Sequence, residues 1–425
     1  MPDRFTATYR IETAHSLEEA AEAMAGEQSS GTFIDVPGET ASLRERHAAR
    51  VESIDPVETV DEPSLPGTTP PNGYDDPEAD DLEYVRAEVT LSFPVENVGR
   101  SLETLMTTVA GNLFELRYFS GMRLLDIDLP ASVVRAYPGP DFGIEGTREV
   151  VGVYDRPIVG TIVKPSVGLS PGSTAKLVGE MVDAGIDFVK DDELIADPPY
   201  SPVEDRVAAV MDAIDEHTGA NEEVMYACNV TGDVDEMLER HDRVRAAGGN
   251  CIMVSLNSVG LAGVVEVTRH SELPIHGHRN GWGGLSRCPQ LGFDYEAWQK
   301  FWRIAGVDHL HVNGIRNKFC ESDASVISSA RECQTPIASE DDVVMPVFSS
   351  GQWAGQAADT YEALGNTDLM YLAGGGIQGH PDGPGAGVTA IKQGWTAALE
   401  GIPLQEYARE HEELRRAIEV FGEDE

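Results

Sequence analysis

A short, largely apolar stretch that ends in charged residues is the part of this sequence most suggestive of chemistry. Residues 186–189 run directly into Lys190, Asp191, Asp192 and Glu193. Because side chains alternate along a strand, Lys190 and Asp192 should point to one side and the other two to the opposite side, unless the strand bends as it leaves the sheet. Carboxylate oxygens are hard ligands, which Mg²⁺ takes in small numbers while keeping waters. The stretch therefore indicates a magnesium site, with a solvated acidic loop as the alternative.

The chain beyond about residue 158 supplies the elements that would position this stretch. Short runs rich in β-branched residues alternate there with segments of helical spacing, such as 173–185. The predicted strands are 158–164, 186–190, 224–230, 251–255, 273–278, 307–312, 343–349 and 369–374. Eight evenly spaced strand–helix units favour a closed (β/α)₈ TIM barrel, and a doubly wound sheet is the alternative.

Polar residues and glycines gather at the carboxyl ends of these runs. They include Lys164, Ser166, Asn229, His276, His278, Arg279, His309, His311, Ser349, Gly351, Gly374 and Gly375. The carboxyl ends of barrel strands carry active sites, so a ring of such residues is typical of an enzyme. Taken singly, His276 and His309 favour buried, hydrogen-bonded core histidines. The glycine-rich ends of the last two strands favour phosphate binding by backbone N–H groups, with tight turns as the alternative.

The first 145 residues follow a different pattern and predict a separate α+β domain of the ferredoxin-like type. The predicted elements are strands over 5–11 and 83–94 and helices over 16–27 and 98–110. Residues 52–81 are rich in Pro, Gly, Asp and Glu, which predicts an exposed acidic loop. The expected organisation is this domain over residues 1–145, then the barrel over 146–425 with a helical tail at its end.

The composition excludes several kinds of partner. The 425 residues include 31 basic and 73 acidic ones, for a net charge of −42, while 41% are hydrophobic. Nucleic acids and anionic membranes bind basic patches, so neither is an expected partner. The acids are spread along the chain and lysine is scarce, which favours a halophilic surface over a specific acidic function.

The cysteines and the start of the chain bear on the compartment. There are five cysteines without CxxC spacing, which disfavours both a zinc site and a disulfide framework. Neither an apolar core of signal-peptide length nor a membrane-spanning apolar run is found in the sequence. We therefore expect a cytoplasmic protein.

Five segments of the barrel half carry a specific resemblance. They are GTIVKPSVGLSP, GIDFVKDDE, HGHR, AGVDHLHV and AGGGIQGHPDGPGAG. In this order they resemble the barrel of the ribulose-bisphosphate carboxylase (Rubisco) large-chain superfamily, and residues 27–33 and 111–112 resemble its N-terminal domain. The chain is identified as a member of this superfamily over nearly its whole length.

The resemblance implies a role for each matching residue. Lys190 would be carbamylated by CO₂, and the carbamate would bind Mg²⁺ together with Asp192 and Glu193. The catalytic residues that the resemblance implies are Lys164, Lys190, Lys318 and His278. The implied substrate or phosphate contacts are Glu27, Thr32, Asn112, Arg279, His311, Ser349, Gly351, Gly374 and Gly375. The first three of these would complete the site of a neighbouring subunit, which implies a homodimer or a larger assembly with shared active sites.

Several residues depart from the carboxylase pattern. Ser166 stands where carboxylases have a second lysine after the first barrel strand, and Trp282 stands where they have a histidine. The loop over 313–320 lacks their Gly-rich, Val-containing sequence. Asn112 stands where the methionine-salvage enolases have a lysine. The chain thus resembles the Rubisco-like proteins, and within them it is most like the 3-oxo-isoapionate-4-phosphate decarboxylase branch.

The resemblance implies an enzyme that forms a Mg-bound enediolate from a phosphorylated, sugar-derived substrate. The predicted reaction is decarboxylation of a 3-oxo sugar acid phosphate, which makes the protein a Mg-dependent carbon–carbon lyase with Lys164 as proton donor. The alternatives are an enolase or isomerase of a phosphorylated ketose, and ribulose-bisphosphate carboxylation. A non-catalytic binding homologue is disfavoured, because the residues of the metal site are present.

Overall fold

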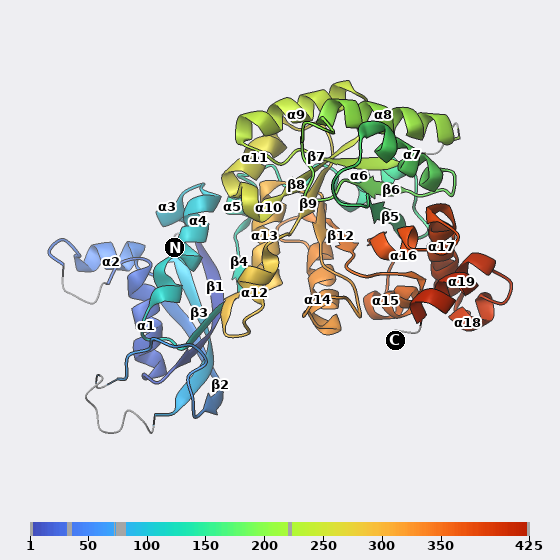
Figure 1. Ribbon diagram of the computed structural model, residues 1–425. Coiled ribbons are helices and arrows are strands. Elements are labelled where there is room, and N and C mark those ends of the chain that lie inside the picture. The colour runs from blue at the N-terminus through green and yellow to red at the C-terminus, as the bar shows by residue number, and fades with distance from the viewer. Residues whose placement is uncertain (1–2, 32–35, 72, 74–81, 220–222, 423–425) are drawn as a thin grey trace. The chain divides into compact units, whose positions relative to one another are not determined.

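The computed structural model describes residues 3–31, 36–71, 73, 82–219 and 223–422. It divides the chain into two compact units (Figure 1). The first unit comprises Met1–Tyr137 and Gly281–Phe301, and the second comprises Pro138–Asn280 and Trp302–Glu425.

The first unit is built on a five-stranded sheet with the order β10-β4-β1-β3-β2. The strands are β1 (Arg4–Thr13), β2 (Arg50–Val60), β3 (Tyr84–Pro94), β4 (Gly121–Asp128) and β10 (Leu291–Phe293). The helices are α1 (Leu17–Glu27), α2 (Ala41–His47), α3 (Val95–Val98), α4 (Leu102–Ala110), α5 (Ala131–Val134), α12 (Trp282–Ser286) and α13 (Tyr295–Ala305), the last of which runs on into the second unit. In β1 and β3 the buried residues alternate with half-buried ones, as expected of strands with one face on a core. The predicted α+β class is confirmed.

The predicted acidic loop over residues 52–81 is wrong for its first part. Residues 50–60 form β2, which pairs antiparallel with β3 at the edge of the sheet. No residue of β2 is buried, so this strand lacks the apolar alternation that identifies strands in a sequence. Pro56 lies beside one of two register shifts in this pair, and an edge strand tolerates a proline there. Residues 72 and 74–81 lie outside the described residues.

The stretch 281–301 also differs from the expected division of the chain at residue 145. Its short strand β10 pairs in parallel with β4, and Arg123 of β4 donates to the backbone oxygens of Cys288 (2.9 Å) and Phe293 (2.6 Å). These contacts join a segment between two barrel strands to the first sheet.

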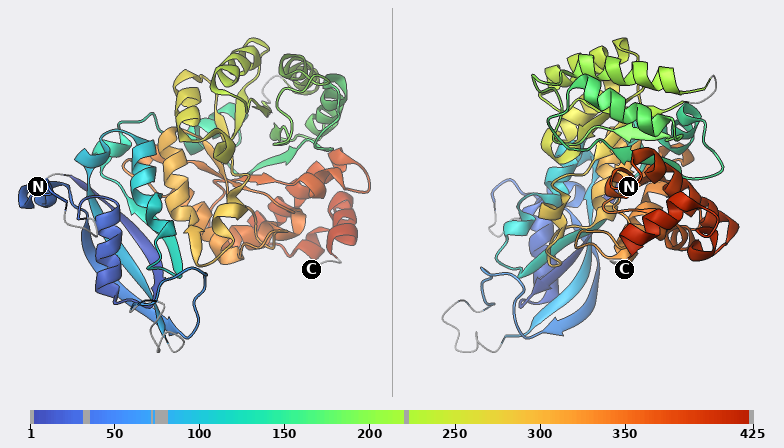
Figure 2. Two further views of the ribbon diagram at one scale, coloured as in Figure 1. Left: turned by 60° about the vertical axis from the view of Figure 1, so that its left-hand side comes forward. Right: turned by 45° about the vertical axis from the view of Figure 1, so that its right-hand side comes forward.

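The second unit is a closed barrel of eight parallel strands, as predicted. In barrel order they are β5 (Ile158–Ile162), β6 (Phe188–Lys190), β7 (Met225–Asn229), β8 (Cys251–Ser255), β9 (Ile275–His278), β11 (His309–His311), β12 (Met345–Phe348) and β13 (Met370–Leu372). Its helices are α6 (Gly143–Val151), α7 (Pro171–Val182), α8 (Val203–His217), α9 (Val234–Ala246), α10 (Leu256–Val259), α11 (Leu261–His270), α14 (Asp323–Gln334), α15 (Ala357–Leu364), α16 (Gly374–Gln378), α17 (Pro384–Glu400), α18 (Leu404–Tyr407) and α19 (Glu412–Phe421). Helices surround the strands in both views of Figure 2.

Apolar side chains fill the interior of the barrel. Ile158, Phe188, Met225, Met253 and Met370, from five different strands, belong to one buried cluster. Gly160 shows how closely β5 and β6 approach, because a Cβ atom there would lie 2.7 Å from the backbone oxygen of Phe188. The cluster closes the interior and leaves the carboxyl ends of the strands to carry polar groups.

Among the described residues, the structure has no helix with the length and apolar character needed to span a bilayer.

Candidate active site

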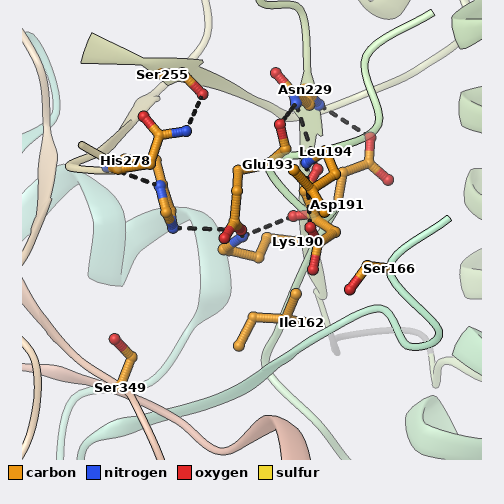
Figure 3. Close-up of polar contacts among 12 residues, drawn as sticks. Ile162, Ser166, Lys190, Asp191, Glu193, Leu194, Asn229, Ser255, His278 and Ser349 are labelled. Carbon is orange, nitrogen blue, oxygen red and sulfur yellow. Dashed lines mark hydrogen bonds and ion pairs between the residues drawn. The ribbon is translucent and has the colours of Figure 1, made fainter. Parts of the chain in front are cut away.

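The end of β6 gathers the predicted metal residues. The Lys190 side chain is fully buried, its Nζ donates to the Asp191 backbone oxygen at 2.7 Å, and it lies 3.6 Å from Glu193 Oε2. Asp192 is 2% exposed. Figure 3 shows Lys190, Glu193 and His278 pointing toward one another. Burial lowers the pKa of Lys190 below its usual value and opposes the three neighbouring carboxylates, which raise it.

Asp191, to which the sequence assigned no role, points away from this group into a buried network. Its Oδ2 accepts from Arg206 Nη2 and from the Asn229 backbone N–H, both at 3.0 Å, and its Oδ1 accepts from Tyr226 Oη at 2.5 Å. Asp191 and Arg206 are each 1% exposed or less. The network ties the end of β6 to α8 and β7, so it fixes the backbone on either side of Lys190 and Asp192.

Lys164 follows β5 and reaches the same carboxylates from the neighbouring strand. Its Nζ donates to Asp192 Oδ2 at 2.5 Å and to Ser166 Oγ at 2.8 Å. Its side chain keeps 45% exposure, so the amine can reach a bound molecule. Ser166, which departs from the carboxylase pattern, therefore supplies an oxygen to Lys164 where a second lysine would supply another positive charge.

His278 closes the group from the opposite strand, β9. Its Nδ1 accepts from the Asn280 backbone N–H at 3.2 Å, so in the neutral ring the proton is on Nε2. Nε2 lies 3.5 Å from Glu193 Oε2. Burial holds the pKa of His278 well below its usual range, so at neutral pH the ring is uncharged and directs an N–H toward this carboxylate.

Arg279 and Asn313, the latter in the loop after β11, both contact Glu321. Arg279 Nη2 lies 2.5 Å from Glu321 Oε2, and Asn313 Nδ2 donates to the same oxygen at 2.7 Å. The predicted phosphate contact Arg279 is thus held by an ion pair that is nearly buried. The sequence did not single out Glu321, because its partner lies 42 residues earlier on another strand end.

Lys318 is carried by this same loop, which is fastened to the end of β12. Its backbone N–H donates to the Ser350 oxygen at 3.2 Å, and its Nζ lies 5.3 Å from the centre of the Phe319 ring. Arg316, two residues earlier, pairs with Asp359 of α15. The structure therefore places Lys318 beside the predicted contacts of β12 rather than in the Lys190 group.

The remaining predicted barrel contacts lie at the ends of β11, β12 and β13. Ser349 Oγ is 3.1 Å from His311 Nδ1, and Gly351 has a φ of 93° in the adjoining turn. Gly374 and Gly375 begin α16, and a Cβ atom at Gly375 would meet open space. The backbone there is accessible, which is what the predicted phosphate contact requires, and that contact stays a prediction.

The predicted contacts of the first unit form a pair of their own. Asn112 Nδ2 donates to Glu27 Oε1 at 3.4 Å, although 85 residues separate them. Thr32 lies outside the described residues. Trp282, which stands at an expected histidine position, packs with Trp298 and Tyr295 at ring-centre distances of 5.0 and 5.9 Å. Trp282 therefore belongs to an aromatic core.

The donor set at β6 fits Mg²⁺ once Lys190 carries a carbamate. Without this change, the buried amine would oppose a cation beside Asp192 and Glu193. A carbamate replaces the amine with anionic oxygen, and formation of a carbamate requires the neutral amine that a lowered pKa favours. The residues present therefore suit the metal that the sequence predicted.

A second group of potential metal ligands lies on the outside of the barrel. His241 Nδ1 and His270 Nε2 lie 3.0 and 2.7 Å from Asp242 Oδ1. The Glu272 backbone N–H donates to His241 Nε2 at 3.4 Å, so the ring proton is on Nδ1, the atom that would have to bind a metal. This group is better described as two imidazoles that donate to one carboxylate.

The chain matches known proteins over nearly its whole length. The catalytic domain of the ribulose bisphosphate carboxylase large chain matches residues 143–421, and its N-terminal domain matches residues 2–65 and 74–133. A 3-oxo-isoapionate-4-phosphate transcarboxylase/hydrolase of Xanthobacter autotrophicus is 53% identical over 98% of this chain and 99% of its own. A 3-oxo-isoapionate-4-phosphate decarboxylase of Rhizobium etli is 47% identical, with the same coverage.

Among solved structures, a Rubisco-like protein from Burkholderia fungorum aligns with a TM-score of 0.90 at 44% identity, covering 99% of this chain and all of the other. The predicted membership is confirmed: the chain belongs to the family of the ribulose bisphosphate carboxylase large chain.

Proposed function

We propose that this protein is an enzyme that decarboxylates a phosphorylated 3-oxo sugar acid of the 3-oxo-isoapionate 4-phosphate type. The observation that carries the proposal is the convergence of Lys164, Lys190, Asp192 and Glu193 at the ends of β5 and β6. The relatives at 45–53% identity, whose names specify this substrate, give its chemical class.

Loss of CO₂ from a 3-oxo acid leaves the electron pair of the broken C–C bond in an enediolate, which must then gain a proton on carbon. Lys164 is the proposed donor, because it is half-exposed and its Nζ already forms short hydrogen bonds to Asp192 and Ser166. The proton passes from Nζ to carbon, and solvent returns it to the amine. The neutral Nε2–H of His278 lies on the opposite side of the group and can orient a substrate oxygen.

Mg²⁺ and CO₂ complete the proposed site. The carbamate of Lys190, with Asp192 and Glu193, would hold the metal, and bound Mg²⁺ would supply positive charge that stabilises developing negative charge on oxygen. Asp191 acts through the backbone, since its network with Arg206 and Tyr226 holds the turn that presents these ligands.

The experiment uses a substrate labelled with ¹³C in its carboxyl group, incubated with enzyme, Mg²⁺ and bicarbonate. Decarboxylation converts all of the label to CO₂ and bicarbonate and incorporates one solvent deuteron on carbon in D₂O. If no label leaves the organic fraction while the substrate is consumed, the proposal is wrong.

A second candidate follows from the relative that is 53% identical, which is a transcarboxylase/hydrolase. Hydrolytic C–C cleavage would add water to the ketone carbon and break its bond to the carbon that carries the labelled carboxylate. The ¹³C label would stay in one organic acid, and the oxygen from H₂¹⁸O would enter the new carboxylate of the other. The same incubation therefore separates the two reactions by the position of the ¹³C label.

Two further activities and a non-catalytic role are the rival outcomes. An enolase or isomerase would exchange solvent deuterium into a ketose phosphate without CO₂ release. A carboxylase would fix labelled CO₂ onto ribulose bisphosphate, which Ser166 disfavours because it lacks the charge of a second lysine. A non-catalytic homologue would bind the sugar phosphate and turn nothing over.

We also propose an assembly and an environment for the enzyme. Glu27 and Asn112 form a pair in the first unit, and the family resemblance assigns them to a neighbouring subunit's site, which supports a homodimer. The excess of 73 acidic over 31 basic residues supports a halophilic protein of the cytoplasm. Sedimentation in high salt should give a dimer or larger species, and dialysis to low salt should abolish the circular dichroism of the fold.

A further inference from the structure

Five side chains form a continuous hydrogen-bonded chain through the barrel interior, from the candidate site to its opposite end. Ser349 Oγ lies 3.1 Å from His311 Nδ1, and His311 Nε2 lies 2.8 Å from His276 Nε2. His276 Nδ1 lies 3.3 Å from His309 Nδ1, whose Nε2 lies 2.8 Å from Thr147 Oγ1. We call this set the histidine chain. The proposed mechanism uses none of the three histidines between its ends.

The three rings are neutral, which limits where their protons can be. Burial lowers the pKa of His309 to about 3 and holds those of His276 and His311 well below the usual range. A neutral imidazole has one N–H and one acceptor nitrogen. Each contact between two rings needs one proton, so the chain has only two self-consistent arrangements, in which all its hydrogen bonds run in one direction or all run in the other.

Thr147 selects between these arrangements. Its hydroxyl donates to the Gly143 backbone oxygen one turn earlier in α6. A hydroxyl has a single proton, so Oγ1 must accept from His309 Nε2–H. His309 Nδ1 then lacks a proton and accepts from His276 Nδ1–H. His276 Nε2 in turn accepts from His311 Nε2–H, which leaves His311 Nδ1 as an acceptor.

We propose that Thr147 is a positioning residue that sets the tautomers of the histidine chain and so makes the Ser349 hydroxyl donate to His311. The Ser349 proton is then used by His311, so Ser349 Oγ, which also lies 3.4 Å from Ser350 Oγ, has lone pairs left to accept from a ligand. It recognises a hydroxyl group of the substrate, which donates, and not a carbonyl or phosphate oxygen, which would need a donor. This last step rests on the proposed function, whereas the tautomers do not.

The test compares Thr147→Val, which has the same shape but no hydroxyl, with Thr147→Ser, which keeps it. Full-length protein is labelled with ¹⁵N in histidine only, and the rings are assigned from single His→Gln variants. Protonated and unprotonated ring nitrogens differ widely in ¹⁵N chemical shift. In the wild type and in T147S, His311 should be protonated at Nε2 and His309 at Nε2.

In T147V the His309 Nε2–H would face a methyl group, and an N–H without an acceptor is costly when buried. The ring should therefore change tautomer, and with it His276 and His311, so that His311 becomes protonated at Nδ1. A wild-type spectrum with His311 protonated at Nδ1 overturns the proposal even if T147V fails to fold. Identical tautomers in the wild type and T147V also overturn it.

Kinetics test the consequence for the substrate. When the tautomers reverse, Ser349 accepts from His311 and its own proton points to the ligand. The Ser349 hydroxyl and the substrate hydroxyl then face each other as two donors, so KM should rise up to about tenfold in T147V with kcat little changed. T147S should restore the wild-type KM. Reversed tautomers with an unchanged KM overturn the assignment of Ser349. Absence of any decarboxylation in the wild type bears on the proposed function alone, because the spectra do not depend on turnover.

Discussion

The barrel interior contains two sets of buried polar groups that differ in charge. On the β5–β6 side, Lys190 lies 3.6 Å from Glu193, and buried Asp191 is paired with Arg206 at 3.0 Å. On the β9–β11–β12 side, the buried rings of His276, His309 and His311 contact one another and the hydroxyls of Thr147 and Ser349, and lowered pKa values keep them neutral. The end of β6 therefore keeps charge by pairing it, as Arg279 and Glu321 also do, whereas the three histidines stay uncharged.

The difference indicates which set of groups can stabilise charge and which can only orient hydrogen bonds. A cation and a developing anion need fixed charges close by, which the paired side provides. The three neutral histidines can only orient hydrogen bonds, and the direction of those bonds depends on tautomers rather than on ion pairs. Variants that remove one group at a time test whether the changes in turnover and stability differ between these two sets.

The largest expected effect is on turnover, from Lys190→Ala. The change removes the carbamate and with it a ligand of the metal, whose charge is worth several kcal/mol, so kcat/KM should fall by more than about a thousandfold. Steady-state CO₂ release at saturating Mg²⁺ and bicarbonate measures it. Lys176→Ala, at an exposed position of α7, is the matched control and should keep full activity. An active K190A protein would remove Lys190 from the site.

Asp191→Ala should be the most damaging change to stability on the paired side. It leaves the buried guanidinium of Arg206 without its partner, and breaking a buried ion pair costs about 3–5 kcal/mol. Urea unfolding at neutral pH measures the loss. Asp215→Ala on the exposed face of the same helix, α8, should change the unfolding free energy by less than about 0.5 kcal/mol. Equal effects of the two changes would show that the pairing does not carry stability.

Tyr226→Phe removes one hydrogen bond from Asp191 and leaves Arg206 in place. A hydrogen bond to a charged group contributes about 1.5–3 kcal/mol, so the unfolding free energy should fall by about that amount. The double variant with Asp191→Ala should cost less than the sum of the two single changes, because both act on one network. Simple additivity would mean that Tyr226 and Asp191 contribute independently.

The sequence predicted those parts of the site that depend on position along a strand. Lys190 and Asp192 point to the site and Asp191 away from it, as alternation predicts. Glu193, which alternation would place with Asp191, lies 3.6 Å from Lys190, because β6 ends at Lys190 and the chain leaves the sheet there. It did not predict why Asp191 is buried, since its partner Arg206 lies on a helix 15 residues later. Local pattern carries no information about such a pairing.

The same limit explains the parts of the fold that were missed. Strand β2 has no buried residue to mark it, and β10 has only three residues and joins a sheet more than 160 residues away in the chain. The sequence predicts His276 and His309 as separate core histidines and His311 as a phosphate contact, with no link between the three rings. The direction of the histidine chain depends on Thr147, whose side chain reaches His309 across 162 residues of sequence.

The smallest expected effect is on the slope of the unfolding free energy against pH, and it tests whether the histidines are neutral. The pKa of His309 is about 3 in the folded protein against about 6.5 when unfolded, so between these values the unfolded chain binds one more proton. Stability is therefore present above pH 6.5 and is lost as the pH falls toward 3, by up to about 1.4 kcal/mol per pH unit for this ring.

In His309→Gln the unfolding free energy, measured in urea from pH 6.5 to 5, should fall less steeply by up to that amount. His47→Gln, at a partly exposed position of the first unit, controls for the exchange of imidazole for amide. An unchanged slope in H309Q would show that His309 accepts its proton inside the fold, and the contrast between the paired charges of β6 and the neutral histidines would then fail.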